Sequence, residues 1–374
     1  MTVLIDFTQI PLKKVGVGVY GLSLIYSLTE SKTSDQFIVL IQSDEKCFDD
    51  INCNNIKFIR INKLFRNFIL RFIIEQFYIP FIVYFNGVDV LHSLHYSFPL
   101  FLPKKKRVVT IHDLTFFIFP ELHRISKRYF FRIFTQLAVK KCDILICVSE
   151  STKTDLQKFT KADADKIFVV HLGKNDHLME FNNDYNHDVK RKYHIDVNKK
   201  IILFIGTIEP RKNIITILHS FIEFKKALND VQLVIVGRKG WYYKNIMEFM
   251  NIHGSEDIIF TGFVSEDEKY SLLSSAYIFV YPSIYEGFGI PVLESISYKI
   301  PTITSNVSSL IEVGGDAVLF ITPDSQIELV NSLNKLYYDM KFREELIERC
   351  SVQANKFSWK EMTSKTIKIY KDLC

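Results

Sequence analysis

Short apolar segments that alternate with helical segments along the whole chain constrain its fold most strongly. The apolar segments are continuous runs rather than alternations of apolar and polar residues, which is typical of strands buried on both faces. Strands of this kind separated by helices predict an α/β fold with parallel, doubly wound sheets. The predicted strands are residues 3–7, 37–42, 58–61, 88–92, 108–111, 144–148, 168–171, 201–206, 232–236, 258–261, 278–281, 302–304 and 318–321.

The length of the chain and one polar interruption predict two domains. A chain of 374 residues is too long for one ordinary core. Only the stretch between Lys174 and Lys200 breaks the alternation, and it is polar and turn-rich, so we place the interdomain linker there. We therefore expect one domain over residues 1–175 and a second over residues 176–355. Ligands of such domains bind at the carboxyl ends of the strands, in a cleft between the two.

Two basic residues follow a predicted strand in the second half. The segment Gly206–Asn213 (GTIEPRKN) comes after a buried strand and before an amphipathic helix, which places Arg211 and Lys212 beside the N-terminus of that helix. Cations are unfavourable at this positive end of the helix dipole, so a bound anion would explain them better than a solvated surface pair. Helix N-termini and basic side chains both bind phosphate, which indicates a diphosphate site.

Two carboxylates frame a glycine-containing turn after a later strand. Glu286 lies in the turn, and Glu294 lies eight residues further on, in a helix whose start is marked by Pro291. Glycines let backbone amides approach a ligand, and carboxylates accept hydrogen bonds from sugar and ribose hydroxyls. Glu294 alone is also explained as a complement to the helix dipole. The pair favours a sugar-binding site.

The segment from Glu286 to Glu294 resembles the E-x7-E signature of the family 4 glycosyltransferases, which are retaining enzymes of the GT-B type. The resemblance extends over nearly the whole chain. Further matching segments, in the order of the family, are residues 15–20, 111–114, 148–151, 206–213, 260–264 and 301–313. The resemblance implies two Rossmann-like domains that face a central cleft. It also implies a C-terminal helix in residues 356–374 that packs back on the N-terminal domain.

The resemblance also implies roles for individual residues. Glu294 would hold the donor ribose, Glu286 would contact hydroxyls of the transferred sugar, and Arg211 and Lys212 would neutralise the departing diphosphate. His112 would hydrogen-bond the donor sugar, although taken alone it is also explained as a structural histidine. The other expected donor contacts are Gly16 and Gly18 near the phosphates and acceptor, and Ser308, Ser309 and Leu310 near the nucleotide or sugar.

The expected reaction is metal-independent transfer of a hexose with retention of configuration. Cleavage of the anomeric bond gives an oxocarbenium-like centre and a diphosphate, so stabilising the leaving group is the main requirement. We expect front-face attack by an acceptor hydroxyl, helped by the donor phosphate, and Glu286 is the one candidate for a covalent nucleophile. Residues 111–121 and 305–313 look closest to bacterial mannosyltransferases of polysaccharide and O-antigen assembly. This implies GDP-mannose as donor and a lipid-linked oligosaccharide as acceptor.

Alternatives to this function stay open. The donor could be a UDP- or dTDP-sugar, and the same architecture serves sugar-nucleotide 2-epimerases, although the E-x7-E match favours transfer. The presence of both carboxylates and both cations argues against an inactive scaffold. His92 and His95 lack a third ligand, so no metal site is expected. The segment Gly237–Trp241 lacks the P-loop spacing and is either a contact for the nucleotide base or a basic surface turn.

Charge and apolar patterns bear on location. Residues 1–175 contain 24 Lys and Arg against 16 Asp and Glu, whereas the remainder contains 23 against 26. This asymmetry suits an anionic membrane or polyphosphate, or is a solvated basic face, and no nucleic-acid-binding module is recognisable. The apolar segment 68–85 is interrupted by Arg71, Glu75 and Pro80, so we expect an interfacial segment or a helix packed on the sheet rather than a membrane span.

The cysteines and the N-terminal segment favour a cytoplasmic location. The chain has six cysteines without metal-ligand spacing, which suits reduced thiols. Residues 3–6 look like a core strand rather than part of a signal peptide. We therefore expect a cytoplasmic enzyme that attaches peripherally to the inner face of the cell membrane.

Overall fold

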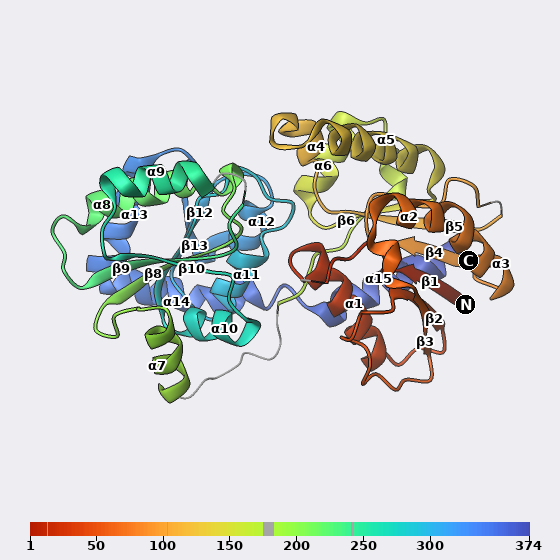
Figure 1. Ribbon diagram of the computed structural model, residues 1–374, viewed down its shortest axis with the longest axis horizontal. Coiled ribbons are helices and arrows are strands. Elements are labelled where there is room, and N and C mark those ends of the chain that lie inside the picture. Colours follow the sequence, from red (N-terminus) through yellow and green to blue (C-terminus); the bar gives the residue numbers. More distant parts are fainter. Residues whose placement is uncertain (13, 103, 175–182, 241–242) are drawn as a thin grey trace. The chain divides into compact units, whose positions relative to one another are not determined.

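The computed structural model describes residues 1–12, 14–102, 104–174, 183–240 and 243–374, which form two compact units (Figure 1). Unit 1 comprises Met1–Gly173 and Ser358–Cys374, and unit 2 comprises Lys174–Phe357. The boundary expected at residues 175 and 176 lies outside the described residues, as does Trp241.

Seven parallel strands form the sheet of unit 1, in the order β3-β2-β1-β4-β5-β6-β7. This is the strand order of a Rossmann-type sheet. Successive strands are added on one side of β1 as far as β3 and then on its other side from β4 onward, so the strand order reverses between β1 and β4. The central strands are buried on both faces: Val3, Leu4 and Ile5 have no exposed surface. The strands are β1 (Thr2–Asp6), β2 (Gln36–Gln42), β3 (Ile56–Ile61), β4 (Val90–Ser93), β5 (Lys106–Ile111), β6 (Ile144–Cys147) and β7 (Ile167–Val169).

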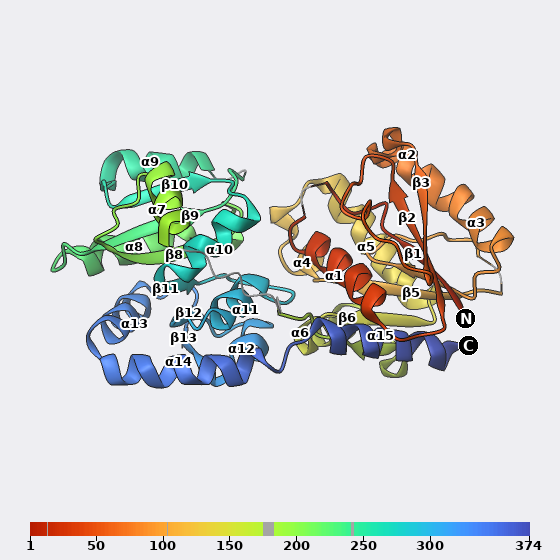
Figure 2. The same cartoon turned by 90° about the horizontal axis from the view of Figure 1, so that it is seen from below.

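Helices cover both faces of this sheet (Figure 2). The face that carries Leu4 and Leu91 packs against the helical stretch that contains Ile79 and Val83. The opposite face carries His92 and receives the last helix of the chain. The helices of unit 1 are α1 (Val17–Glu30), α2 (Phe68–Ile73), α3 (Ile79–Phe85), α4 (Thr115–Ile118), α5 (Ile125–Lys141), α6 (Glu150–Phe159) and α15 (Trp359–Leu373).

A buried chain of hydrogen bonds attaches α15 to unit 1. His92 lies 2.5 Å through Nδ1 from the hydroxyl of Tyr370 and 2.8 Å through Nε2 from Oγ1 of Thr110, which is 3.0 Å from the hydroxyl of Tyr20. All four side chains are buried. Burial, with a smaller effect of His112, lowers the pKa of His92 to about 3. The neutral imidazole therefore links the sheet to Tyr370, which lies 278 positions after His92 in the sequence.

We expect His92→Gln to reduce the loss of stability in acid. The unfolded chain protonates His92 near pH 6.5 and the folded chain only near pH 3, so the free energy of unfolding falls as the pH falls through this window. Between about pH 7.5 and 5.5, one such histidine lowers it by about 1.4 kcal/mol. Urea unfolding at both pH values measures this loss, with His187→Gln, an exposed histidine of unit 2, as the control. An unchanged acid loss in His92→Gln would contradict the expectation.

Six parallel strands form the sheet of unit 2, in the order β10-β9-β8-β11-β12-β13, which again reverses beside its first strand. The strands are β8 (Lys200–Ile205), β9 (Val231–Val236), β10 (Ile258–Gly262), β11 (Ala276–Tyr281), β12 (Thr302–Ser305) and β13 (Val318–Ile321). The helices are α7 (Asn183–Lys192), α8 (Ile214–Lys225), α9 (Tyr243–His253), α10 (Glu266–Ser274), α11 (Ile290–Ser297), α12 (Leu310–Gly314), α13 (Gln326–Tyr338) and α14 (Met340–Ala354). The predicted class, two doubly wound Rossmann-like units, is confirmed, and each predicted strand is present within two residues of its expected bounds.

The interpretation of residues 174–200 as a turn-rich linker is wrong in part. Residues 183–192 form helix α7 of unit 2. Its basic last turn complements the helix dipole. Tertiary contacts then fix it: Val189 is buried, and Asn186 accepts a hydrogen bond from Ser271 of α10 at 2.5 Å. The polar composition of α7 gave no apolar pattern at helical spacing, because only a narrow part of the helix surface is apolar, so the sequence did not predict this helix.

Candidate active site

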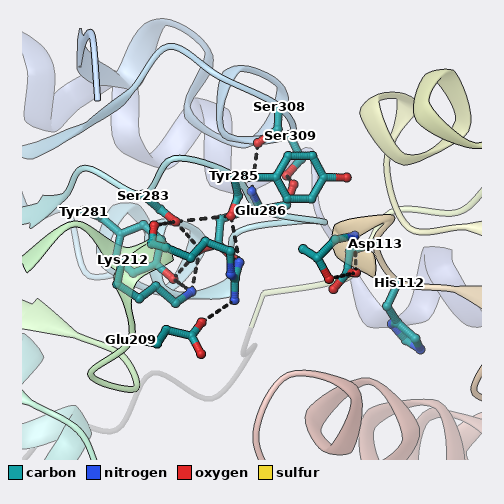
Figure 3. Close-up of polar contacts among 12 residues, drawn as sticks. His112, Asp113, Glu209, Lys212, Tyr281, Ser283, Tyr285, Glu286, Ser308 and Ser309 are labelled. Carbon is teal, nitrogen blue, oxygen red and sulfur yellow. Dashed lines mark hydrogen bonds and ion pairs between the residues drawn. The ribbon is translucent and has the colours of Figure 1, made fainter. Parts of the chain in front are cut away.

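The two motifs of the second half meet at the edge of the unit 2 sheet. Strands β8 and β11 are neighbours in that sheet, and the strand order reverses between them. The segment Gly206–Asn213 follows β8, and the turn that contains Glu286 follows β11. Because the carboxyl ends of parallel strands share one edge, the fold brings Arg211 and Lys212 to Glu286. Figure 3 shows the resulting cluster of side chains.

Glu286 is the centre of this cluster. Its Oε1 accepts hydrogen bonds from Lys212 Nζ, from the hydroxyl of Tyr281 at 3.0 Å and from Oγ of Ser283 at 2.6 Å. Its Oε2 accepts from Nη1 of Arg211 at 2.8 Å. Only 7% of Glu286 is exposed. We name Glu209, Arg211, Lys212, Tyr281, Ser283 and Glu286 the Glu286 cluster.

The charges of the cluster balance. Burial alone would raise the pKa of Glu286, but the charges of Arg211 and Lys212 lower it to about 2, so the carboxylate is ionised at neutral pH. Burial and then the charge of Arg211 lower the pKa of Lys212. Glu209 binds the other side of Arg211, with 2.8 Å between Nη2 and Oε1. Two cations and two carboxylates are thus held together, and an arriving anion would exchange partners with an acidic side chain.

The loop after β12 fixes the backbone of the Glu286 turn. The backbone N–H of Glu286 donates to Oγ of Ser308 at 2.9 Å, and Oγ of Ser309 donates to the Glu286 carbonyl at 2.9 Å. Leu310 is fully buried. A Cβ on Gly289, whose φ is +103°, would lie 2.8 Å from Leu310 Cδ2, so glycine is required there. The three expected donor contacts support the turn, and their contact with a donor stays a prediction.

Glu294 lies in α11 and pairs with Lys269 of α10 rather than with the Glu286 cluster. The distance between Lys269 Nζ and Glu294 Oε1 is 2.8 Å, and both side chains are largely buried. Burial alone would lower the pKa of Lys269, but the charge of Glu294, with smaller effects of Tyr270 and Glu266, raises it above its usual value. Lys269 therefore stays charged, whereas burial raises the pKa of Glu294 above its usual value against the opposing charge of Lys269. Its role in binding a ribose stays a prediction.

In unit 1, His112 follows β5 at the carboxyl edge of the sheet, one strand beyond the reversal of strand order between β1 and β4. Its Nε2 lies 2.8 Å from the carbonyl oxygen of Leu94, which follows β4, and its ring meets Tyr20 of α1 edge-on at 5.1 Å. Burial lowers the pKa of His112, against smaller effects of Leu94 and Asp113, so the ring is neutral at pH 7. Because the Leu94 carbonyl accepts a hydrogen bond from Nε2–H, the single ring proton is on Nε2, and Nδ1 is left as a hydrogen-bond acceptor.

Gly16 and Gly18, at the start of α1, are favoured for different structural reasons. Gly16 has φ of +50° and immediately precedes α1, so its backbone conformation favours glycine. Gly18 lies in the first turn of α1, where an added Cβ would be 3.2 Å from Lys14 Cβ. A small residue at Gly18 therefore lets Lys14 pack closely against the first turn of α1.

The remaining motifs make contacts within their own units, and a contact of the Gly237 loop with the nucleotide base stays a prediction. His92 holds α15 by the hydrogen bonds described above, and His95 packs edge-on against Tyr96. Within the described residues, His, Cys, Asp and Glu side chains form no group of three or more suited to a metal ion. A Cβ on Gly237 would overlap the carbonyl of Gly206, so the loop after β9 packs directly on the loop after β8.

Sequence reasoning missed four residues of the site. Glu209 lies within the segment Gly206–Asn213, whereas Tyr281 ends β11 and Ser283 follows it, before the Glu286 turn. Their positions at strand ends were the available signal. Lys269 has no local signal, because it reaches Glu294 from a helix 25 positions earlier in the sequence.

Solved structures of known proteins share this fold over the whole chain. A glycosyltransferase from Rickettsia africae has a TM-score of 0.77 at 19% identity and covers 100% of this chain and 98% of its own. HepE of Anabaena, in complex with UDP and glucose, has a TM-score of 0.78 at 14% identity and covers 100% of both chains. WaaG, a glycosyltransferase involved in lipopolysaccharide biosynthesis, has a TM-score of 0.75 at 14% identity, with 98% and 99% covered. The chain has the GT-B fold of these glycosyltransferases.

Sequence comparisons give the family. The model described as Glycosyltransferase Family 4 matches residues 16–177, and the model described as Glycosyl transferases group 1 matches residues 186–351. Together they cover most of the chain and every expected site residue. The chain belongs to the family 4 glycosyltransferases.

Curated relatives of this chain include three named mannosyltransferases. O-antigen chain mannosyltransferase B of Escherichia coli is 29% identical over 76% of this chain and 75% of its own length. O-antigen chain mannosyltransferase RfbU of Salmonella typhimurium is 28% identical over 66% of this chain and 64% of its own. Serotype-specific mannosyltransferase WbdA of E. coli is 27% identical over 75% of this chain, but the match spans only 35% of WbdA.

We expect Glu286→Gln to destabilise unit 2. A neutral amide leaves Lys212 and Arg211 without the carboxylate that compensates their burial, and breaking a buried pair in this way lowers the free energy of unfolding by about 3–5 kcal/mol. Glu209→Gln is the matched control, because Glu209 is more exposed and contacts Arg211 alone in the cluster; its cost is about 1 kcal/mol or less. Chemical unfolding of both variants measures the difference. Equal costs would show that Glu286 is not the central counter-charge.

Proposed function

We propose that this glycosyltransferase transfers mannose from GDP-mannose, with retention and without a metal ion, to a lipid-linked or oligosaccharide acceptor in cell-surface polysaccharide synthesis. The observation that carries the transfer chemistry is the Glu286 cluster at the strand-order reversal of unit 2. The names of the O-antigen mannosyltransferases support the choice of mannose and of the pathway class. The acceptor places the reaction at the inner face of the cell membrane.

The cluster is suited to stabilising a departing diphosphate. Glu286 holds Arg211 and Lys212 in fixed positions before the donor arrives, which removes a reorganisation cost from the reaction step. The diphosphate would replace Glu209 as the partner of Nη2 of Arg211, since Glu209 is the more exposed of the two carboxylates. The positive charge of Arg211 and Lys212 then stabilises the negative charge that develops as the anomeric bond breaks.

The acceptor hydroxyl attacks the anomeric carbon from the side on which the diphosphate leaves, and its proton passes to the leaving phosphate. Nδ1 of the neutral His112 accepts a hydrogen bond from a donor sugar hydroxyl. Glu294, held in place by its pairing with Lys269, accepts hydrogen bonds from the ribose. Glu286 is saturated by four donor groups, which favours this front-face route over a covalent intermediate on Glu286.

A UDP-sugar donor is the second candidate. It is favoured by the fold shared with HepE, whose solved structures contain UDP or UDP-glucose. A panel of nucleotide sugars with a lipid-diphosphate-linked acceptor, in the presence of EDTA, separates the two donors. We expect a mannosylated product with α configuration from GDP-mannose, identified by mass and anomeric analysis. Transfer from a UDP-sugar alone would replace the proposed donor, and epimerisation without an acceptor would replace the proposed reaction.

We expect Arg211→Ala to lower kcat/KM by about 10²–10³-fold, the effect of removing one preorganised donor to a developing negative charge. The control is Arg349→Ala, because Arg349 is an exposed arginine of α14 that pairs with Glu345 on the surface. Initial rates with the accepted donor give both values. Full activity of Arg211→Ala would remove the leaving-group argument.

A further inference from the structure

An unusual apolar face lies on the helical stretch of unit 1 between residues 68 and 85. This stretch comprises α2, a π-helical turn (Ile74–Tyr78) and α3. Five side chains spaced four residues apart are exposed along one side of it: Ile69, Ile73, Phe77, Phe81 and Phe85. Residues at this spacing share one side of a helix. We name these five residues the apolar face. Phe77 and Phe85 are each 75% exposed, and such large apolar groups in water mark an interaction surface.

The same stretch is long and apolar enough to cross a membrane, by length and composition alone. Its other side, however, belongs to the core of unit 1. Ile74, Ile79 and Val83 are buried against strand residues of the sheet. Arg71 and Glu75 form a buried ion pair at 2.7 Å, and Ser97 donates a hydrogen bond to the same Glu75 oxygen at 2.7 Å. Insertion across a bilayer would remove these contacts, so the stretch is fixed on its domain.

A second exposed stripe lies on the neighbouring helix α5. Phe130 of α5 packs edge-on against Phe68 of α2, with 4.9 Å between ring centroids. Ile125, Tyr129 and Ile133, again four residues apart, are exposed on α5. Both views of the molecule show α2 and α5 on the same face of the unit 1 sheet (Figures 1 and 2). The exposed apolar surface is therefore carried by two packed helices.

The chain segments that carry and flank this surface are basic. Residues 60–132 contain 12 Lys and Arg against 4 Asp and Glu. Lys63, Lys104 and Lys127 are exposed, whereas Glu75 is buried in its ion pair. Basic groups beside exposed aromatic and aliphatic groups match the interface of an anionic bilayer. A second copy of the chain fits less well, because a symmetric dimer would bring the same basic region against itself.

We propose that the apolar face docks unit 1 on the surface of a bilayer that contains anionic lipid. Phe77, Phe81 and Phe85 enter the boundary between headgroups and acyl chains, and the surrounding lysines contact the headgroups. The helices lie along the membrane and do not cross it. The inference rests on the proposed function only in that a lipid-linked acceptor brings the enzyme to a membrane.

Sedimentation of the full chain with vesicles tests the docking. We expect binding to vesicles of phosphatidylcholine mixed with phosphatidylglycerol, weaker binding to phosphatidylcholine alone, and weakening with salt. The double variant Phe77→Ser, Phe85→Ser should lower the partition coefficient about tenfold per phenylalanine. The matched control is Ile252→Ser, Ile327→Ser, since both isoleucines are 76% exposed in unit 2. Because all four side chains point into solvent, the variants should keep the wild-type circular dichroism and thermal unfolding.

A second variant tests the charges independently. Lys104→Gln, Lys127→Gln should weaken binding to the anionic vesicles about fivefold per lysine, whereas Lys244→Gln, Lys341→Gln in unit 2, also exposed, should not. Failure of the wild type to bind anionic vesicles, or unchanged binding by the phenylalanine variant, would overturn the proposal. Loss of a dimer in that variant, with vesicle binding intact, would assign the face to self-association instead. No nucleotide sugar is present, so a wrong donor assignment leaves the result unaffected.

Discussion

Burial of each central strand on both faces is the constraint on which the rest of this molecule depends. A strand with no exposed surface needs helices on either side, and only a parallel sheet with crossover connections supplies them in both units. The same arrangement gathers the carboxyl ends of all strands at one edge. The Glu286 cluster follows from this geometry, since its residues come from loops after two strands that are adjacent in space and more than seventy positions apart in sequence.

Within that frame, charge compensation organises the site. Two carboxylates, Glu209 and the buried Glu286 with its pKa near 2, balance the charges of Arg211 and Lys212 in a preformed site. In the proposed reaction, such a site would bind the diphosphate by exchanging ion-pair partners, which costs less free energy than desolvating free cations. The loop after β12 holds the Glu286 turn in place. Ser308 accepts a hydrogen bond from the backbone N–H of Glu286, and Leu310 packs against Gly289.

The features that could be predicted from the sequence are those that depend on a local pattern of residues. Continuous apolar runs located every strand within two residues, and the positions of Arg211, Lys212 and Glu286 after strands predicted their neighbourhood. Helix α7 was missed because its stability comes from contacts with α10 rather than from its own composition. Lys269 was missed because the pairing of α10 with α11 is set by packing and has no signature in either segment. The exposure of the stretch 68–85 was left undecided, since an amphipathic pattern does not reveal how wide the buried side is.

The attachment of α15 to the unit 1 sheet has a consequence for synthesis of the chain. The hydrogen bonds of His92, Thr110 and Tyr20 are completed by Tyr370, which leaves the ribosome only after all of unit 2 has been made. During translation, the part of the unit 1 sheet that α15 covers therefore stays uncovered until unit 2 has been made. A nascent chain of this enzyme thus exposes apolar surface of unit 1 while unit 2 is being made, and the emergence of α15 ends that interval.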